Sequence, residues 1–329
     1  MSQITLSNGK SFAAAHGATI LDAGLRAGVS LAYSCRTGRC GTCRGRVDAG
    51  ETRALHDETG LTAAEREDGW ILTCVRTPTT DVTIEADDLG AVPLAAARTL
   101  ACRIQALDAL APDVLRVTLR LPPTATLDYR PGQYIDVIGH GGLRRSYSIA
   151  NAPAADRRLE LHVGRVDGGA MSDYWFGAAR VDDLLRLHGP LGTFFLREPD
   201  DVDLVFLATG TGIAPVKAIL EDLGRRPDAG QPRSVRVYFG GRRPADLYWT
   251  PDAGTARFVP VLSRADAAWG GARGHVQDAL LADMPDLAQA AVYACGSDAM
   301  IHDAHAATAR AGLPANRFLS DAFVCSADA

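Results

Sequence analysis

The stretch Tyr33-Ser-Cys-Arg-Thr-Gly-Arg-Cys-Gly-Thr-Cys43 is a cysteine-rich loop that decides how the first part of the chain folds. It places Cys35, Cys40 and Cys43 in the spacing C-x4-C-x2-C. That spacing, completed by a distant fourth cysteine, is the plant-type arrangement of ligands for a [2Fe–2S] cluster. Cys74 is available as the fourth ligand. The loop therefore predicts an N-terminal domain that holds such a cluster.

Two other uses of these cysteines stay open, a zinc site and buried thiols. Structural zinc sites usually pair two C-x2-C knuckles, which this stretch lacks. Gly38 and Gly41 stand between the cysteines, where a backbone without Cβ can wrap closely and aim its amides at sulfur. These observations favour the cluster.

Arginines surround the cysteines, and the set is Arg36, Arg39, Arg44 and Arg46. A basic rim of this kind can raise the potential of a cluster or dock an acidic partner. Solvated surface charge is an equally good explanation.

Length and composition describe an ordinary globular chain of two or three domains. It has 329 residues, of which 47% are hydrophobic and 22% are charged. The net charge of −5 gives no footprint for nucleic acid, which requires clustered basic residues. The chain starts without an apolar signal segment, and no stretch approaches about 18 uninterrupted apolar residues. We therefore expect a cytoplasmic protein without a membrane segment, and its seven cysteines fit a reducing compartment.

Short elements flank the cysteine loop. Residues 3–14 alternate in the manner of strands around Asn8-Gly9, a strong hairpin signal. Thr19 opens a short helix that ends at Gly28. Residues 81–86 alternate as a closing strand.

A second pattern follows an Ala-rich linker at residues 87–99. Residues 114–121 and 133–138 alternate as short strands between Pro and Gly turns, which predicts a small antiparallel barrel. The predicted division of the chain is a first domain at 1–90, a linker at 91–99, a barrel domain at 100–199 and an α/β domain at 200–329.

The third region opens on a strand, a glycine-rich turn and a helix. The strand is residues 203–208, the turn is Thr209-Gly-Thr-Gly-Ile-Ala-Pro215 and the helix is residues 216–224. This order gives the phosphate-cradling geometry of α/β nucleotide domains, although Pro215 replaces the last glycine of the G-x-G-x-x-G fingerprint. Further strands indicate a doubly wound sheet, at residues 235–239, 256–262 and 291–294.

Three motifs in these regions carry candidate binding groups. Arg145, Tyr147 and Ser148 follow one another on a strand, where they can serve a phosphate, a planar ring and a ring nitrogen, or simply form a half-buried strand. A Gly-Gly turn leads to Ser172, either as a pyrophosphate seat or as a helix cap. Cys295 follows the last parallel strand, where ligands bind in such sheets, and a buried inert thiol is the alternative.

Together these motifs resemble the ferredoxin-NAD(P)H reductase superfamily in its three-domain, iron-sulfur flavoprotein form, over essentially the whole chain. The resemblance implies a β-grasp plant-type ferredoxin domain, an antiparallel β-barrel that binds FAD and an α/β doubly wound domain that binds NAD(P). Residues 33–43 are similar to the reductase components of ring-hydroxylating dioxygenases. Four other stretches are similar to the CDP-6-deoxy-glucoseen reductases of 3,6-dideoxyhexose synthesis, namely Leu119-Arg-Leu-Pro-Pro-Thr124, residues 144–153, Gly189-Pro-Leu-Gly-Thr-Phe-Phe195 and Tyr293-Ala-Cys-Gly-Ser297.

The resemblance also implies roles for single residues. Arg145 would bind the FAD pyrophosphate, Tyr147 would pack on the isoalloxazine and Ser148 would lie near flavin N5. Ser148 and Cys295, with Phe323 approaching the flavin, are the implied catalytic residues. The other residues implied to bind FAD or the nicotinamide dinucleotide are Gly169, Met171, Ser172, Gly210, Thr211, Gly212, Pro215, Cys295 and Gly296.

Two features bear on the dinucleotide. Gly164 stands where relatives usually carry a basic residue, and Arg165 is the candidate substitute. Arg242 and Arg243 follow a strand near the expected adenosine ribose, where they could accept a 2′-phosphate. Related NADH-using reductases also carry an arginine there, so we expect NADH as the better donor and NADPH as a second one.

The implied function is to accept electrons in pairs and to pass them on one at a time. Nicotinamides deliver hydride, whereas a [2Fe–2S] cluster accepts one electron, and a flavin joins the two steps. The implied order is NAD(P)H, FAD, cluster and an external acceptor, which is a Rieske or di-iron oxygenase component or a CDP-sugar dehydrase. His162 and His188 are expected to be packing or surface residues, and a monomer is the default.

Two other functions stay open. A stand-alone iron-sulfur electron carrier would explain the first domain but would leave the nucleotide-type loops without a role. A flavin oxidase, a diaphorase or a nitric-oxide-type dioxygenase would use the last two domains, and such proteins usually carry a haem domain in place of a ferredoxin.

Overall fold

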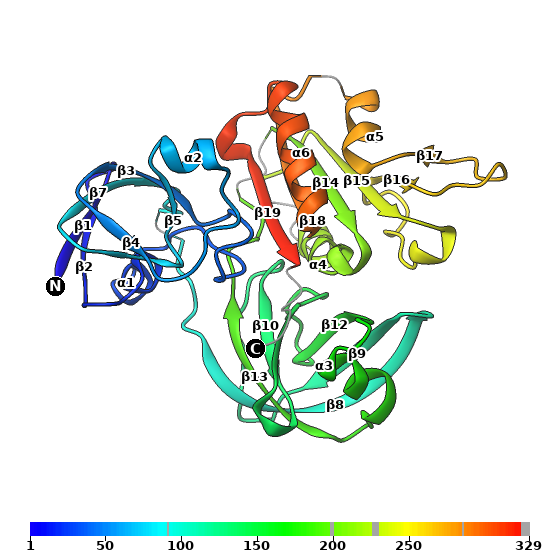
Figure 1. Cartoon of the computed structure of the whole chain (residues 1–329). Coiled ribbons are helices and arrows are strands. Elements are labelled where there is room, and N and C mark those ends of the chain that lie inside the picture. Colours follow the sequence, from blue (N-terminus) through cyan, green and yellow to red (C-terminus); the bar gives the residue numbers. More distant parts are fainter. Residues whose placement is uncertain (91, 198–200, 226–229, 285, 324–329) are drawn as a thin grey trace. The chain divides into compact units, whose positions relative to one another are not determined.

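The structure, a computed structural model, describes all residues except 91, 198–200, 226–229, 285 and 324–329 (Figure 1). The chain forms two compact units. One is Met1–Leu94 together with the C-terminal residues from Asp321 on, and the other is Ala95–Ser320. No helix in the described ranges is long and apolar enough to cross a membrane.

The first unit is built on a five-stranded mixed sheet of order β2-β1-β7-β3-β5 (Figure 1). β1 and β7 run parallel, whereas the other neighbours run antiparallel. Gly9, at φ 86°, turns the hairpin predicted from Asn8-Gly9, and that prediction is confirmed. The strands are β1 (Ser2–Leu6), β2 (Ser11–Ala14), β3 (Arg44–Ala49), β5 (Trp70–Leu72) and β7 (Val82–Ala86).

The predicted helix of this unit is α1 (Ile20–Arg26). The Thr19 hydroxyl caps it by accepting the Asp22 amide at 3.0 Å. Ile20 and Leu21 are fully buried in the apolar core that the sheet supplies. Three shorter elements complete the unit, namely β4 (Thr52–Ala54), α2 (Ala63–Glu67) and β6 (Arg76–Pro78).

The second unit begins with a six-stranded antiparallel sheet of order β11-β10-β13-β8-β9-β12. A bridge between Ile149 and Leu161 joins its two edges, so the sheet closes into the predicted barrel. The strands are β8 (Arg98–Ala111), β9 (Val114–Arg120), β10 (Tyr134–Ile138), β11 (Arg144–Ser148), β12 (Arg158–Gly164) and β13 (Leu184–Leu191).

Short helical turns connect the barrel strands. η1 (His140–Gly142) joins β10 to β11, and α3 (Ala170–Asp173) runs directly into one π-helical turn, η2 (Tyr174–Ala178). π-helical turns are rare in proteins, but those that occur often lie at functional sites. Ahead of the barrel, residues 92–97 have no regular secondary structure, and residue 91 of the expected linker lies outside the described residues.

The rest of the second unit is a sheet of order β17-β16-β15-β14-β18-β19. Every described pairing from β17 to β18 is parallel, and the strand order turns back at β14. This arrangement is the predicted doubly wound sheet. The strands are β14 (Asp203–Thr209), β15 (Ser234–Gly241), β16 (Arg257–Leu262), β17 (Ala272–Arg273), β18 (Ala290–Ser297) and β19 (Phe318–Phe323).

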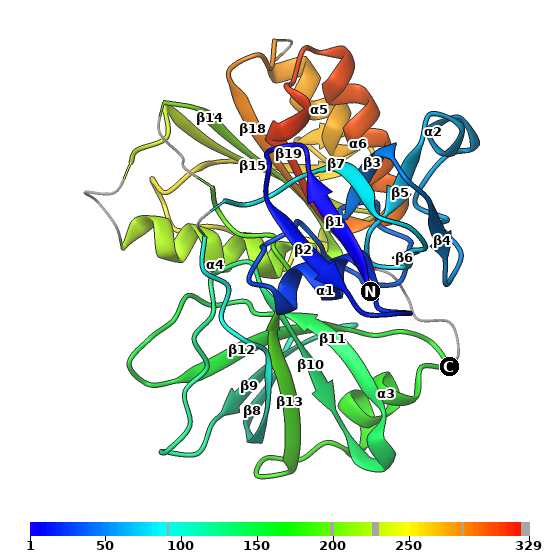
Figure 2. The ribbon, with the colours of Figure 1, turned by 90° about the vertical axis from the view of Figure 1, so that its left-hand side faces the viewer.

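Helices cover both faces of this sheet. Figure 2 shows α4 (Ile213–Gly224) on one side, and α5 (Val276–Asp283) and α6 (Asp298–Arg310) together on the other, as right-handed crossovers on either side of β14 require. α4 begins ahead of the predicted start at residue 216, because Pro215 is tolerated in the first helical turn. Three 3-10 turns accompany the strands, η3 (Gly210–Gly212), η4 (Pro244–Asp246) and η5 (Ala315–Arg317).

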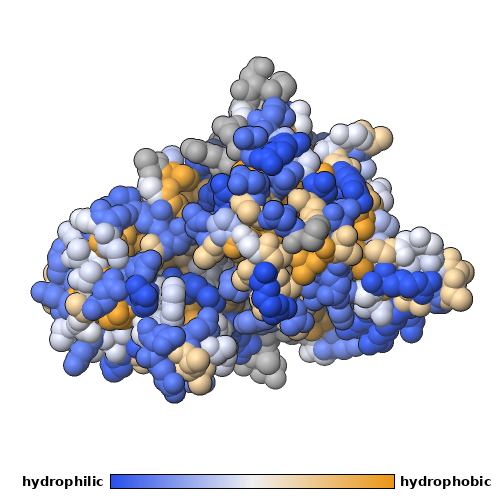
Figure 3. Space-filling model, turned by 90° about the horizontal axis from the view of Figure 1, so that it is seen from above, coloured by the Kyte–Doolittle hydropathy of each residue, from blue (hydrophilic) through white to orange (hydrophobic). Residues whose placement is uncertain are grey.

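The surface is mostly hydrophilic where Figure 3 displays it. Among the described residues, the large apolar side chains that stand out into solvent are Met1, Val166, Val181 and Leu184. Isolated exposed residues of this kind are normal on a folded protein.

Gly132 is a tight packing point where the barrel meets α4. It precedes β10 at φ +101°, and a Cβ there would overlap the Phe194 carbonyl oxygen and stand 3.1 Å from Ile219 of α4. A glycine is therefore required by space as well as by conformation.

We expect Gly132→Ala to lower the free energy of unfolding by about 3 kcal/mol, because it adds a backbone clash to an unfavourable φ. Gly141→Ala is the matched control, since Gly141 has φ +70° and open space around it, and it should cost only about 1 kcal/mol. Urea unfolding followed by circular dichroism measures both losses. Equal losses would show that the Phe194 carbonyl does not constrain this turn.

Candidate functional site

The four predicted cluster ligands come together in the first unit as two pairs. The thiols of Cys35 and Cys40 hydrogen-bond each other, and so do those of Cys43 and Cys74. Within the described part of the chain, no three His, Cys, Asp or Glu side chains are grouped so that they could bind a single metal ion. Two pairs rather than one cage are what a two-iron cluster requires, because each iron takes two protein ligands.

The electrostatics of these pairs suit a group bound by thiolates. The hydrogen bond with Cys40 lowers the pKa of Cys35 to about 5, and the amides of Thr37 and Cys40 both donate to Cys35 Sγ at 3.4 Å. Hydrogen bonding to the partner thiol, together with burial, raises the pKa of Cys40 and of Cys43. A soft four-sulfur donor set with one readily ionised member fits a [2Fe–2S] cluster.

A second segment, residues 57–60, packs directly against the backbone of this loop. Gly38 has φ +77°, and a Cβ on it would overlap the Asp57 carbonyl oxygen, while a Cβ on Gly60 would overlap the Arg39 carbonyl. The Gly60 amide donates to the Gly38 carbonyl at 2.9 Å. Glycine lets the loop wrap closely, as the sequence suggested, and the segment at 57–60 is the partner that the sequence did not identify.

The basic rim around the cysteines is largely neutralised. Ion pairs join Arg36 to Asp22, Arg44 to Glu65 at 3.2 Å and Arg46 to Glu85 at 2.9 Å. Pairs this exposed add little stability, but they cancel most of the local positive charge. The rim is therefore weaker than four arginines in sequence suggest.

The predicted flavin residues lie on β11 in the second unit. Arg145 and Tyr147 are two residues apart and share one face of the strand, whereas Ser148 has its side chain on the opposite face and is buried. Burial raises the pKa of Tyr147 to about 12, so its phenol stays protonated. A cation and a ring on one face suit a phosphate and a stacked heterocycle.

Sequence reasoning missed the residue that holds Tyr147. Trp175 in η2 is 2% exposed and donates from Nε1 to the Tyr147 hydroxyl at 2.9 Å. The two rings meet edge to face at 85°, so the tryptophan fixes the plane of the tyrosine. The aromatic run after Ser172 was the only trace of this in the sequence.

The predicted phosphate turn starts α3. Gly169 is its N-cap residue, and the buried Ser172 hydroxyl accepts the Val166 amide at 2.9 Å. Met171 is buried beside Gly139. The Ser172 side chain thus closes the turn from inside instead of capping the helix end.

The predicted dinucleotide loops meet at the carboxyl ends of β14 and β18, which are neighbouring strands. A Cβ on Gly212 would overlap the Cys295 carbonyl, and a Cβ on Gly296 would overlap the Thr209 hydroxyl. Gly210 has φ +54° and open space beside it. The Cys295 side chain is fully buried. The glycines therefore serve close packing between loops and leave an open backbone edge of the kind that receives phosphates.

Gly164 is the last residue of β12 and lies next to η3. A Cβ on it would stand 3.3 Å from Cγ2 of Thr211 in η3, so a longer side chain would press on the dinucleotide loop. The Arg165 guanidinium instead stacks on the Phe176 ring of η2 at 4.4 Å from its centre. The Arg165 charge therefore lies beside η2, and its role as the substitute for a basic residue at position 164 stays a prediction.

A buried polar network joins the barrel to the α/β region. His162 on β12 contacts Glu160 through Nε2 at 2.8 Å and the Tyr248 hydroxyl through Nδ1 at 3.2 Å. Lys217 of α4 lies 3.4 Å from the same Glu160 carboxylate and 2.6 Å from Glu221. The sequence offered only scattered polar residues here, and the prediction of His162 as a packing residue missed these bonds.

The protonation states of this network follow from its surroundings. Burial lowers the pKa of His162, which outweighs the opposite pull of Glu160. A neutral His162 donates its Nε2 hydrogen to Glu160 and accepts the Tyr248 hydrogen at Nδ1. Burial opposes ionisation of Glu160, but the bond from His162 and the charge of Lys217 lower its pKa. The network is thus a neutral imidazole next to an ion pair.

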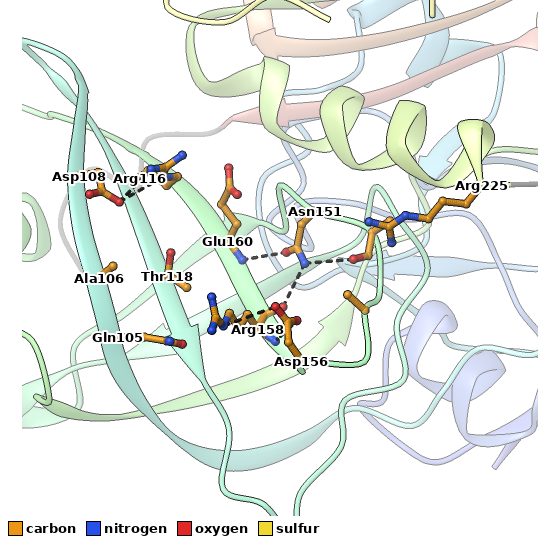
Figure 4. A pocket seen from close by; sticks show the side chains of 12 residues that line it. Gln105, Ala106, Asp108, Arg116, Thr118, Asn151, Asp156, Arg158, Glu160 and Arg225 are labelled. Carbon is orange, nitrogen blue, oxygen red and sulfur yellow. Dashed lines mark hydrogen bonds and ion pairs between the residues drawn. The ribbon is translucent and has the colours of Figure 1, made fainter. Parts of the chain in front are cut away.

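The barrel carries a hollow of about 410 Å³, and Figure 4 shows the side chains that line it. Its charged groups are paired locally, as Arg116 is with Asp108 at 3.1 Å and Arg158 with Asp156 at 3.4 Å. None of the residues predicted to bind a cofactor lines it. It reaches the polar network through Glu160, and it is not the predicted flavin site.

The remaining predicted residues lie at the ends of strands. Phe323 ends β19 and is half-buried. The amides of Arg242 and Arg243, at the end of β15, donate to Asp246 at 2.6 and 2.9 Å, and both side chains are exposed. These guanidinium groups are thus displayed at the edge where an adenosine ribose is expected.

Comparison with family models finds three successive domains. Residues 4–79 match a 2Fe-2S iron-sulfur cluster binding domain, residues 101–196 match an oxidoreductase FAD-binding domain and residues 206–306 match an oxidoreductase NAD-binding domain. The cofactors expected from the sequence, a [2Fe–2S] cluster, FAD and NAD, are confirmed at this level.

Named relatives span the same three domains. The chain is 41% identical to the CDP-6-deoxy-L-threo-D-glycero-4-hexulose-3-dehydrase reductase of Yersinia pestis, covering 94% of each chain. It is 38% identical to the aromatic O-demethylase reductase subunit of an Amycolatopsis species, covering 87% of each. The solved Amycolatopsis cytochrome P450 reductase GcoB matches with a TM-score of 0.76 and 34% identity over 98% of this chain and 99% of that one.

The three comparisons each cover between 87% and 99% of this chain and of the relative. The chain therefore belongs to the family of three-domain iron-sulfur flavoprotein reductases, oxidoreductases that pass electrons from NAD(P)H through FAD and a [2Fe–2S] cluster.

Proposed function

We propose that this chain is an NADH-dependent reductase component that transfers electrons one at a time to a separate acceptor protein. The observation that carries the proposal is that one chain combines two thiol pairs, a flavin-type strand and a glycine-lined dinucleotide edge. A stand-alone iron-sulfur carrier would leave the FAD-binding and NAD-binding domains unused, and a haem-containing oxidase would not need the thiol pairs.

The proposed roles follow the sequence assignments. Cys35, Cys40, Cys43 and Cys74 hold the cluster, which takes up single electrons when bound. Tyr147, fixed by Trp175, presents a ring to the flavin, and Arg145 on the same face meets its phosphates. Gly210–Gly212 and Cys295-Gly296 receive the dinucleotide. Ser148, Cys295 and Phe323 border the reacting rings, where they position them and exclude water.

We further propose the setting in which the chain works. The domains are 1–90, 100–199 and 200–329 with a linker at 91–99. The acceptor is a CDP-hexulose dehydrase or an oxygenase component, since the names of relatives point to both. None of the six described cysteines forms a disulfide bond, and we take this as support for a cytoplasmic location. A monomer is the simplest state for such a chain.

We expect Cys40→Ser to abolish cluster absorbance and cytochrome c reduction by NADH, because the cluster loses a ligand. Ferricyanide reduction should remain within about twofold, because the flavin reduces it without the cluster. Cys102→Ala is the control, since Cys102 is a buried thiol of the barrel core, and it should leave both activities intact. Loss of both activities in Cys40→Ser with FAD still bound would contradict the electron order.

We expect Tyr147→Ala to weaken FAD binding about tenfold, because a stacked ring is worth about 1 kcal/mol beyond its burial. Tyr147→Phe keeps the ring and loses only the Trp175 bond, so it should retain flavin better. The flavin-to-protein ratio after gel filtration and titration of the apoprotein with FAD measure both. Unchanged flavin occupancy in Tyr147→Ala would remove this residue from the site.

We expect kcat/KM with NADH to exceed that with NADPH. Arg242 and Arg243 are exposed and make the second donor usable without requiring it. Steady-state ferricyanide reduction with each nucleotide gives the ratio. A ratio of about tenfold in favour of NADPH would reverse the assignment, and loss of NADPH use alone in Arg243→Gln would locate the 2′-phosphate.

A further inference from the structure

A buried carboxylate stands behind the cysteine loop of the first unit. The Glu58 side chain is only 4% exposed, although it lies in a connecting segment between β4 and α2. Carboxylates are rarely buried unless they are fully hydrogen-bonded. The contacts of Glu58 therefore require an explanation.

The Glu58 carboxylate accepts hydrogen bonds from the chain on both sides of Cys74. Its Oε1 accepts the backbone amide of Leu72 at 2.7 Å, and its Oε2 accepts Nε and Nη2 of Arg76 at 2.9 and 2.7 Å. Nη1 of the same arginine donates to the Thr52 hydroxyl at 2.9 Å. One carboxylate thus fixes the residue two before the fourth ligand and the residue two after it.

The segment that carries Glu58 also covers the loop of the other three ligands. The Gly60 amide donates to the Gly38 carbonyl at 2.9 Å, and Asp57 and Gly60 make the close backbone contacts with that loop. The Glu58 carbonyl accepts from Arg66 Nη1 at 3.1 Å, which holds the segment from its far side. Glu58 therefore links the Cys74 segment to the loop of Cys35, Cys40 and Cys43, in addition to the direct bonds from the Thr73 amide and hydroxyl to the Cys43 carbonyl, both at 3.0 Å.

We propose that Glu58 and Arg76 are positioning residues for the cluster, a clamp that sets the position of Cys74 relative to Cys35, Cys40 and Cys43. The inference rests on the proposed assignment of the four cysteines. Cys43 and Cys74 belong to one pair but come from the two segments that this clamp joins. Residues that orient metal ligands from behind are worth about 10–100-fold in metal retention in other proteins.

The clamp has no net charge. The buried Glu58 and the half-buried Arg76 form an ion pair that is neutral as a whole. Removing only the carboxylate charge leaves the guanidinium cation two residues from a ligand. A nearby cation favours the more negative, reduced cluster, so the potential should rise. A residue with a merely structural role would change stability without moving the potential.

The test uses the full-length protein with its cluster and flavin. The variants are Glu58→Gln, which removes the charge, Glu58→Asp, which keeps the charge on a shorter arm, and Arg76→Lys, which keeps the cation but cannot make the paired bonds. Asp108→Asn is the matched control, because Asp108 forms an exposed ion pair with Arg116 in the second unit and belongs to no rim around the cysteines. Iron release to a chelator, low-temperature EPR and a redox titration are the readouts.

We expect all three clamp variants to release iron about tenfold faster than wild type, with altered g values in the EPR spectrum. Of the clamp variants, only Glu58→Gln should raise the midpoint potential, and Asp108→Asn should match wild type throughout. Iron release at the wild-type rate in Glu58→Asp and Arg76→Lys would overturn the clamp, even if Glu58→Gln did not fold. Absence of a [2Fe–2S] signal from reduced wild type would instead refute the assignment of the cysteines.

Discussion

The cysteine loop and the loops after β14 and β18 depend on the same constraint. In each place one stretch of backbone lies so close to another that no Cβ fits between them. In the first unit, Gly38 and Gly60 let the segment at 57–60 lie directly on the cysteine loop. A loop that must turn its amides toward sulfur cannot also satisfy itself as helix or sheet. Its stability therefore comes from the covering segment, and that segment is held by the buried Glu58 carboxylate.

The same device operates at the dinucleotide edge. Gly212 leaves room for the Cys295 carbonyl, and Gly296 leaves room for the Thr209 hydroxyl, so the loops after β14 and β18 touch through their backbones. Because these strands are neighbours, their carboxyl ends already meet at one edge. The glycines remove the side chains that would hold the two loops apart. The result is a shallow backbone surface at the sheet edge.

How far the sequence predicts this protein depends on the range of the interaction. The cysteine spacing, the Asn8-Gly9 turn and the strand–glycine–helix unit at 203–224 are local signals, and the structure has each of these elements. The links Glu58–Arg76 and Tyr147–Trp175 join residues far apart in sequence, and single residues of these types carry no signal. Even the β11 strand was predictable where its supporting tryptophan was not. Sequence thus predicts local elements better than the distant residues that support them.

Lys217 and His162 show why the barrel and the α/β region are joined by polar groups. Apolar surfaces would bury as much area, but they can slide, whereas the hydrogen bonds that cross here, at 3.0 and 3.2 Å, fix direction as well as distance. Hydride transfer is sensitive to displacements of about 1 Å, so fixed direction matters here. Burying such groups is tolerable only because the imidazole stays neutral and the lysine lies between two carboxylates. The network therefore gives up some stability relative to an apolar contact in exchange for a defined geometry between β12 of the barrel and α4.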